Sequence, residues 1–342
     1  MATETVPAAI TFPVDQAWLD KGREDILEPG LPIVDPHHHL WERDSRYLFD
    51  ELRADLNTGH NIVATVFLQC GAMIRAGGDP DFAAVGETEF VNGVAAMSAS
   101  GLYGPTRVCA GIVGHADLRL GARVRPVLEA HLRASGRFRG IRNSSTYSED
   151  ERLRTTPRFA PKGLLADARF REGFACLAPL DLSFDAWLYF TQLGELADLA
   201  RAFPETKLIL NHCGAPLGIG PYAGKREEVF AAWRQGIAEL ARCPNVHVKL
   251  GGLGMRVMGF GFEAKPLPPT STDLAEAWRP YLETCIAAFG PDRAMFESNF
   301  PVDKQSCAYP VLWNAFKRIA VSYSEDEKKK LFSGTASKVY RL

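Results

Sequence analysis

Short apolar runs alternate with longer amphipathic segments from about residue 30 to the end of the chain, and this alternation is the feature that most constrains the fold. Eight runs are rich in Val, Ile, Leu and Phe, as strands covered on both faces are. Between them, residues 192–203 and 227–241 carry apolar residues at the spacing of one helix face. The predicted strands are residues 32–35, 62–68, 107–113, 138–142, 180–185, 207–211, 246–250 and 294–297.

Eight strands that alternate with helices over roughly 300 residues predict an α/β fold, a closed (β/α)8 TIM barrel in a single domain. An open doubly wound sheet is the alternative, but no G-x-G-x-x-G or Walker sequence follows the first strand to indicate nucleotide binding. Residues 1–30 are predicted to form an irregular arm and residues 31–342 the barrel. Residues 72–86 and 260–272 are predicted to be long loops, and Ser324 begins a capping box for the last helix.

The composition excludes several classes of protein. Of 342 residues, 46% are hydrophobic and 23% charged, which is typical of globular proteins, and the net charge of −2 offers no electrostatic footprint for nucleic acid or anionic lipid. The seven cysteines are widely spaced without a C-x-x-C pair, which argues for a reducing cytoplasm. No signal-like N-terminus or long apolar run appears. The expected partner is a small molecule, and the oligomeric state stays open, with a homodimer as one option.

A cluster of histidines where the first strand ends is the strongest indication of chemistry. Three of the eight histidines are consecutive, at positions 37 to 39. In an extended chain Asp35, His37 and His39 share one face, while His38 points to the other. Two imidazoles at this spacing can converge on one divalent metal at the end of the barrel where active sites lie. The alternative is a polar loop that carries histidines by chance.

Six segments at predicted strands or strand ends carry a resemblance to a known family. They are Val-Asp-Pro-His-His-His-Leu-Trp at 34–41, Phe-Arg-Gly-Ile-Arg at 138–142, Leu-Ser-Phe-Asp at 182–185, Leu-Asn-His-Cys-Gly-Ala-Pro at 210–216, Val-His-Val-Lys-Leu-Gly-Gly-Leu at 246–253 and Met-Phe-Glu-Ser-Asn-Phe-Pro-Val at 295–302. In this order they resemble the amidohydrolase superfamily, specifically the amidohydrolase-2 group that holds 2-pyrone-4,6-dicarboxylate lactonase and sugar-acid lactonases. The resemblance covers about residues 31–342.

The resemblance implies a role for three histidines. It assigns His37 and His39 to the pair on the first strand and His212 to the sixth strand. These three residues are the expected ligands of one divalent metal, zinc or manganese, held weakly. A metal-free mechanism, in which the histidines act directly on the substrate, is the alternative that related lactonases suggest.

One departure from the family concerns the end of the eighth strand. Many relatives read Gly-Ser-Asp-Trp-Pro there, and the Asp activates water or binds metal, whereas this chain has Asn299. An amide cannot act as a general base at neutral pH. Glu297 or Asp303 could replace the missing carboxylate, although Glu297 could instead pair with a buried cation. A second departure is that no His follows the fifth strand.

Four polar residues are expected to bind the substrate. Arg142 ends the fourth strand, where its planar guanidinium could hold a carboxylate with two hydrogen bonds, or form a salt bridge at the rim. Lys249 could add a second cation, although an ion pair inside the barrel is the other explanation. Asn299 could contact the substrate, and Asp185 could bind it or orient the histidines or the arginine.

The sequence therefore predicts a hydrolase of the amidohydrolase-2 type. We expect it to open a lactone or ester bond in a small, anionic, oxygen-rich molecule by attack of water, with stabilisation of the oxyanion. Metal-dependent non-oxidative decarboxylation is the first alternative. The second is a barrel that binds a small anion without catalysis.

Overall fold

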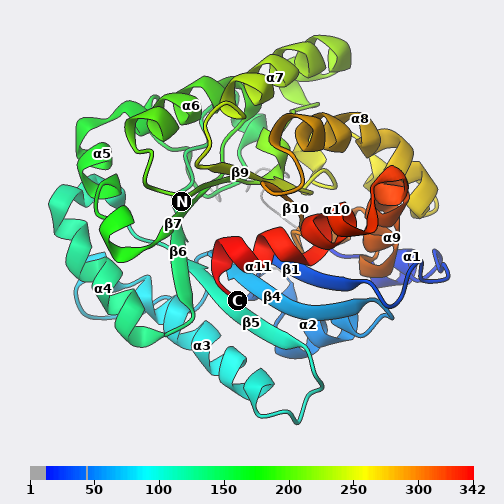
Figure 1. Ribbon diagram of the computed structural model, residues 1–342, viewed down its shortest axis with the longest axis horizontal. Coiled ribbons are helices and arrows are strands. Elements are labelled where there is room, and N and C mark those ends of the chain that lie inside the picture. Colours follow the sequence, from blue (N-terminus) through cyan, green and yellow to red (C-terminus); the bar gives the residue numbers. More distant parts are fainter. Residues whose placement is uncertain (1–12, 44) are drawn as a thin grey trace, which may run out of the picture.

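The computed structural model describes residues 13–43 and 45–342, and it confirms the predicted (β/α)8 barrel (Figure 1). Eight parallel strands pair side by side in one sheet, and the helices lie around its outside. A separate antiparallel pair, β2 (Trp41–Glu42) and β3 (Arg46–Tyr47), follows the first strand. In spatial order the barrel strands are β1 (Pro32–His38), β4 (Asn61–Leu68), β5 (Arg107–Gly114), β6 (Phe138–Arg142), β7 (Ser183–Ala186), β8 (Leu208–Leu210), β9 (Val246–Leu250) and β10 (Ala294–Phe296).

The barrel closes between its first and last strands just beyond the end of β10. The amide of Asn299 donates to the carbonyl of His37 at 2.9 Å, and the amide of His39 donates to the carbonyl of Phe300 at 2.8 Å. Asp35 of β1 also stabilises this seam between β1 and the segment after β10, because its carboxylate accepts a hydrogen bond from the Ser298 amide at 3.0 Å. The seam therefore brings the histidines of β1 beside the segment that follows β10.

The helices mostly begin and end where the sequence predicts. The segment 192–203 forms α6, the segment 227–241 forms α7, and Ser324 caps α10 through the predicted capping box. Each predicted loop contains a short 3-10 turn and is shortened by the helix after it. The helices are α1 (Gln16–Leu19), α2 (Phe49–Leu56), α3 (Val85–Ala99), α4 (Arg125–Ala134), α5 (Ala168–Phe174), α6 (Leu193–Ala202), α7 (Arg226–Leu240), α8 (Ser271–Phe289), α9 (Tyr309–Ile319), α10 (Glu325–Lys329) and α11 (Thr335–Tyr340).

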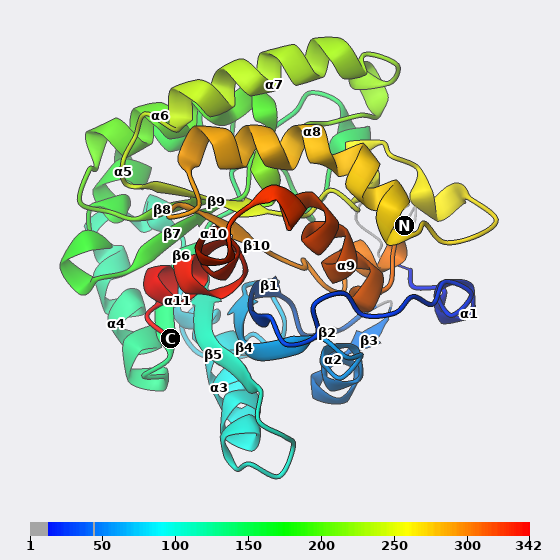
Figure 2. The same cartoon turned by 45° about the vertical axis from the view of Figure 1, so that its right-hand side comes forward.

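Two apolar cores lie on the two sides of the sheet. The larger core fills the space between strands and helices, and the smaller one fills the inside of the barrel. The C-terminal helix α11 belongs to the inner core, and both views show it against β1, β4 and β5 (Figures 1 and 2). There Gly111 of β5 lies close to this helix end, because a methyl group in its place would be in tight contact with the side chains of Leu342 and Val66. The last helix thus plugs the barrel at the end opposite the histidines.

The segment before the barrel packs against α9. Lys317 donates to the carbonyls of Leu27 and Glu28 at 2.7 and 2.9 Å, and Asn314 donates to the carbonyl of Asp25 at 2.9 Å. Of the predicted arm, residues 1–12 lie outside the described residues. Among the helices of the described part, none has both the length and the apolar character to cross a membrane.

A fully buried ion pair crosses the inside of the barrel. Lys249 of β9 donates to Asp185 of β7 at 2.8 Å, and both side chains are excluded from solvent. Asn211 and the hydroxyl of Tyr340, from α11, also donate to Oδ1 of Asp185, at 3.0 and 2.9 Å. Buried charges of this kind are tolerated when both are present and are costly when one is left alone.

We predict that Lys249→Met lowers the free energy of unfolding by about 3–5 kcal/mol, because it leaves the Asp185 carboxylate buried without its cation. The double variant Lys249→Met/Asp185→Asn should recover part of this loss, because it removes both charges. Urea denaturation of the three proteins measures the difference. Equal losses in the single and double variants would contradict a charge-balancing role for the pair.

Candidate active site

Three histidines converge at the end of the barrel opposite α11. His37 and His39 lie at and just after the end of β1, and His212 follows β8. The ring centroid of His37 lies 5.0 Å from that of His39 and 4.5 Å from that of His212. His38 points to the outer side, where its Nε2 pairs with the Thr65 hydroxyl at 2.9 Å. The alternation expected from an extended chain therefore holds at this strand end.

Glu297 connects the first and sixth barrel strands through two of these histidines. One carboxylate oxygen, Oε2, lies 2.6 Å from Nδ1 of His37. The other, Oε1, accepts from Nδ1 of His212 at 2.8 Å and from its backbone amide at 3.0 Å. Glu297 is fully buried, and burial raises its pKa to about 8. Glu297 could have paired with a buried cation, but its two oxygens instead lie next to the imidazoles of His37 and His212.

The histidines are neutral and share one tautomer. Burial lowers the pKa of His37, His39 and His212 well below the ordinary value. Nδ1 of His39 donates to the carbonyl of Leu68 at 2.8 Å, and Nδ1 of His212 donates to Glu297. The second nitrogen of each ring, Nε2, is therefore unprotonated. His39 and His212 line a cavity, so these two nitrogens are lone-pair donors toward it.

The backbone after β8 is held in an uncommon conformation. His212, Cys213 and Ala215 have φ angles of 55°, 52° and 45°, in the left-handed region that residues other than Gly avoid. Gly252, after β9, packs directly on the His212 ring. A Cβ at this position would lie closer than 3.0 Å to three atoms of that side chain. The glycine run after β9 thus makes room for His212, and its own turn at Gly252 has a φ of 68°.

Arg142 lies beside His37 but part of its guanidinium is already engaged. Its Nη1 donates to Nε2 of His37 at 3.3 Å, and its Nε donates to the side-chain oxygen of Gln69 at 3.3 Å. Nη2 donates to the backbone carbonyl of Gln69. Three of the five N–H groups of an arginine are thus used, and two remain for a ligand. The sequence analysis did not identify Gln69 as the residue that holds this arginine.

The other predicted substrate-binding residues separate into two groups. Asn299 lines the cavity, whereas Lys249 and Asp185 pair with each other below it and do not. The ion pair explains this placement, because each side chain neutralises the other out of reach of solvent. Nζ of Lys249 lies 3.4 Å from Nδ1 of His37, so the ion pair contacts the site through His37.

Asp303 lies behind Asn299 rather than in the cavity. Its two oxygens accept from Nδ2 of Asn299 at 2.8 Å and from the amide of Gly254 at 2.9 Å. It is fully buried, and burial raises its pKa to about 8. Asn299 has a φ of 57°, a conformation that Asn tolerates better than most residues. Asp303 therefore orients the Asn299 amide.

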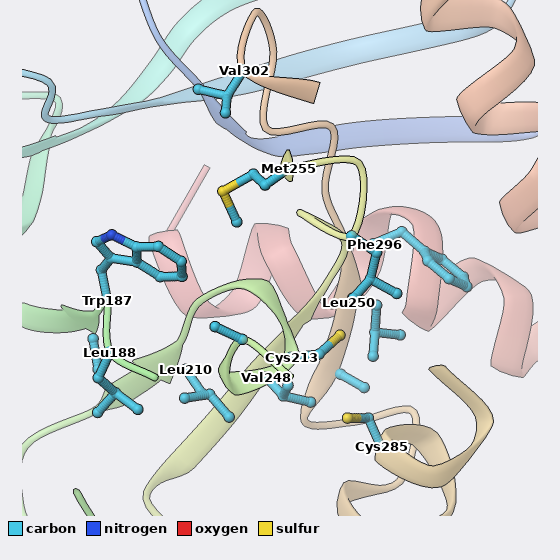
Figure 3. Packing of buried hydrophobic residues seen from close by; sticks show 14 of the residues in the cluster. Trp187, Leu188, Leu210, Cys213, Val248, Leu250, Met255, Cys285, Phe296 and Val302 are labelled. Carbon is cyan, nitrogen blue, oxygen red and sulfur yellow. The ribbon is translucent and has the colours of Figure 1, made fainter. Parts of the chain in front are cut away.

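His39 and His212 line a cavity of about 270 Å³, whereas His37 lies outside its lining. Trp187, Met255 and Val302 form an apolar side, and Figure 3 shows them above Leu210 and Val248 of the barrel strands. Trp41 and Pro157 also line it, and the rest of the lining, apart from Cys70, is polar; among the described residues it contains three arginines and no carboxylate. The polar and cysteine lining residues are His39, Arg43, Gln69, Cys70, His115, Arg142, Asn143, Ser144, Thr155, Thr156, Arg158, His212 and Asn299.

His115 is a lining residue that the sequence analysis missed. It directly follows β5, and its Nδ1 donates to the carbonyl of Arg142 at 3.0 Å. Burial lowers its pKa, so the ring is neutral. The signal was present, because a histidine just after a barrel strand is the same pattern that identified His37 and His212.

Some of these side chains form a donor set that fits a divalent metal. His37, His212 and Glu297 offer ligand atoms within 4.8 Å of one another, and Oε2 of Glu297 lacks a well-aligned hydrogen bond within the described chain. Two imidazoles and a carboxylate are ligands that zinc accepts. His39 was expected in this set, but the structure ties it to Leu68 and puts Glu297 in the group instead.

We predict a pH-dependent difference between the wild type and Asp303→Asn. A pKa of about 8 in the folded state, against an ordinary 3.8, means that the folded chain holds this proton more tightly. The contribution of Asp303 to stability is therefore present at low pH and is lost as the pH rises toward 8. Asp303→Asn should gain relative to wild type by at most about 1.4 kcal/mol per pH unit. Urea denaturation at pH 5, 6 and 7 measures it, and a constant difference would contradict the raised pKa.

We predict that Gly252→Ala displaces the His212 ring and lowers the free energy of unfolding by about 1–3 kcal/mol beyond the cost of the left-handed backbone. Gly261→Ala is the matched control, because Gly261 has a similar φ of 66° and open space around its Cα. Urea denaturation and the imidazole resonances in ¹⁵N NMR report the two effects. Equal destabilisation in both variants, with unchanged His212 resonances, would show that Gly252 is needed only for its backbone angle.

Comparison with known proteins places the chain in a family. The amidohydrolase family model matches residues 34–342. An uncharacterized protein of Sinorhizobium fredii, y4mH, is 35% identical over 91% of this chain and 99% of its own length. An L-fucono-1,5-lactonase of Burkholderia multivorans is 27% identical over 92% of this chain and 97% of its own.

A solved structure shares the architecture. It is a zinc-bound amidohydrolase from Burkholderia multivorans, with a TM-score of 0.70 and 26% identity, covering 91% of this chain and 99% of that one. The shared architecture agrees with the match of the family model over nearly the whole chain. The chain is therefore an enzyme of the amidohydrolase family.

Proposed function

We propose that this enzyme opens a lactone ring by attack of water, in the cavity above His39 and His212. The observation that carries the proposal is the His212–Glu297 pair: Glu297 holds Nδ1 of a neutral histidine that lines the cavity. The relatives named L-fucono-1,5-lactonase, at 27% and 29% identity, support a lactone as the substrate. All seven cysteines are free thiols, which supports the cytoplasm as the location.

The His212–Glu297 pair can act as a general base. A water molecule in the cavity would give a proton to Nε2 of His212 as its oxygen attacks the lactone carbonyl. When the tetrahedral intermediate collapses, the ring C–O bond breaks and the proton passes from Nε2 to the departing ring oxygen. Above its pKa of about 8, the ionised Glu297 carboxylate would stabilise the imidazolium that forms and keep the ring in its tautomer, as the carboxylate of a catalytic triad does. His39 offers a second unprotonated Nε2 beside it, which can orient the same water by accepting a hydrogen bond.

Arg142 can stabilise the negative charge that develops on the carbonyl oxygen or bind an acidic group of the substrate. Two of its N–H groups are free of protein partners, and Gln69 fixes the plane of the guanidinium. Arg43 and Arg158 line the same cavity. Three cations without a lining carboxylate favour an anionic or strongly polar substrate.

A divalent metal would fit the group of His37, His212 and Glu297, and we propose that it is held weakly. When bound, it would polarise the carbonyl and lower the pKa of a coordinated water. Nη1 of Arg142 and Nζ of Lys249 lie 3.3 and 3.4 Å from the two nitrogens of His37, and their charges oppose a further cation. Asn299 adds no negative charge where relatives have Asp.

The test is hydrolysis of L-fucono-1,5-lactone and L-rhamnono-γ-lactone, followed by acid release, before and after treatment with a chelator. We predict that, above pH about 8 where Glu297 is ionised, Glu297→Gln lowers kcat by about 100- to 10,000-fold, because it keeps the shape of the side chain but removes the charge behind His212. Asp303→Asn is the matched control, since Asp303 is an equally buried carboxylate that contacts no histidine.

Three results would contradict parts of this proposal. A larger loss in Asp303→Asn than in Glu297→Gln would assign the base to Asp303. Release of CO2 from aromatic carboxylates, without hydrolysis of either lactone, would favour the decarboxylase alternative. Stoichiometric metal that stays in the purified protein after treatment with the chelator would contradict weak metal binding.

A further inference from the structure

We propose that His115 binds a hydroxyl group of the substrate through Nε2 and makes the enzyme selective for lactones that carry hydroxyl groups. The inference rests on the proposed lactonase function. His115 lies at the end of β5, on the wall of the cavity next to Arg142 and away from the carboxylate of Glu297.

The tautomer of His115 is set by the backbone. Its Nδ1 lies 3.0 Å from the carbonyl oxygen of Arg142, which can only accept, so this nitrogen carries the proton. Nε2 is then unprotonated, and no partner for it occurs in residues 13–43 or 45–342. His131 supports the same turn, because its Nε2 donates to the carbonyl of His115 at 2.9 Å. His115 is therefore a fixed hydrogen-bond acceptor at the cavity wall.

His115 is one of several acceptors in this cavity: Oδ1 of Asn299 also has no partner among residues 13–43 and 45–342, and the hydroxyls of Ser144, Thr155 and Thr156 can donate or accept. The three lining arginines are donors, and the side-chain oxygen of Gln69 already accepts from Arg142. The Nε2 nitrogens of His39 and His212 are assigned to the attacking water. His115 thus provides an acceptor that the proposed reaction does not use.

A hydroxyl group is the substrate feature that such an acceptor requires. A substrate hydroxyl buried without an acceptor loses its hydrogen bond to water, whereas a substrate without hydroxyl groups leaves Nε2 itself unpaired. Sites that hydrogen-bond a substrate hydroxyl discriminate strongly against analogues that lack it, because the polar groups of the site are then left without partners. The ring that meets His115 should therefore be hydroxylated, while the arginines meet the carbonyl and any acidic group.

The experiment compares two lactones of the same ring size, L-fucono-1,5-lactone and δ-valerolactone, which has no hydroxyl groups. The quantity measured is the ratio of their kcat/KM values. His115→Asn places an amide where Nδ1 was, so it keeps the bond to the Arg142 carbonyl but removes the acceptor in the cavity. His115→Gln places its amide where Nε2 was, so it keeps an acceptor in the cavity but gives up the bond to the backbone.

A matched control is His60→Asn. His60 is a buried histidine before β4, at the opposite end of the barrel, where its Nε2 pairs with the carbonyl of Pro310 at 3.0 Å. This control reports the loss of a buried imidazole without any change in the cavity. Circular dichroism and thermal unfolding establish that each variant is folded.

We expect wild type to prefer the hydroxylated lactone, His115→Asn to reduce that preference by about 10- to 100-fold, and His115→Gln and His60→Asn to retain most of it. Equal loss toward both lactones in His115→Asn would mean that His115 only supports the fold, and would overturn the proposal. A wild type that does not prefer the hydroxylated lactone would also overturn it, even if no variant folds.

The hydrolase and the hydroxyl site can fail separately. If wild type hydrolyses neither lactone, the proposed function fails, and calorimetric titration with L-fucono-1,5-lactone then decides on His115. Binding to wild type that His115→Asn weakens by at least about tenfold would still support the hydroxyl site. Unchanged binding in His115→Asn, or no binding to wild type, would overturn it.

Discussion

The buried carboxylate of Glu297 is the constraint on which the rest of the site depends. A charge taken out of water must be matched by donors that the fold supplies, and here the donors are the backbone amide and Nδ1 of His212, while Nδ1 of His37 lies 2.6 Å from the other oxygen. These groups come from the first, sixth and eighth barrel strands, so they meet only when the barrel is closed. The hydrogen bond from the Asn299 amide to the carbonyl of His37 joins the segment after β10 to β1. The alignment of these two segments therefore determines whether the site forms.

The charges below the cavity are arranged so that no single group is left alone. Arg142 and Lys249 are the buried cations, and Asp185 and Glu297 are the anions that lie among them. Both cations are near His37, so this imidazole is the least able of the three to gain a proton. His212 contacts Glu297 and no cation directly, and it is therefore the histidine best placed to accept a proton from water. The same arrangement weakens the site for a metal ion, because a cation would have to compete with charges that the fold has already placed there.

The strands could be predicted well because their signal is local. A strand covered on both faces must be apolar over several residues, and two of the predicted strands, at 138–142 and 246–250, coincide with β6 and β9. The convergence of His37, His39 and His212 followed from their places at strand ends. The partner of Lys249 could not be read from the sequence, since Asp185 lies 64 residues away and an ion pair leaves no periodic pattern. The contact of Gln69 with Arg142 involves a backbone carbonyl, which has no sequence pattern. In the left-handed turn at His212 only Gly214, with a φ of 70°, is of a residue type that favours this conformation.

The histidines of the cavity differ in what holds their protonated nitrogen, and this difference separates their chemistry. In His39 and His115 the proton on Nδ1 faces a backbone carbonyl, which is neutral and stabilises an imidazolium little. In His212 it faces the carboxylate of Glu297, whose charge can balance the proton that the ring would take from water. A histidine held by a carbonyl therefore remains a neutral acceptor through the reaction, and one held by a carboxylate can become a base. By this reasoning a single residue type, fixed in one tautomer at three strand ends, can supply both the base and the recognition of hydroxyl groups in one small cavity.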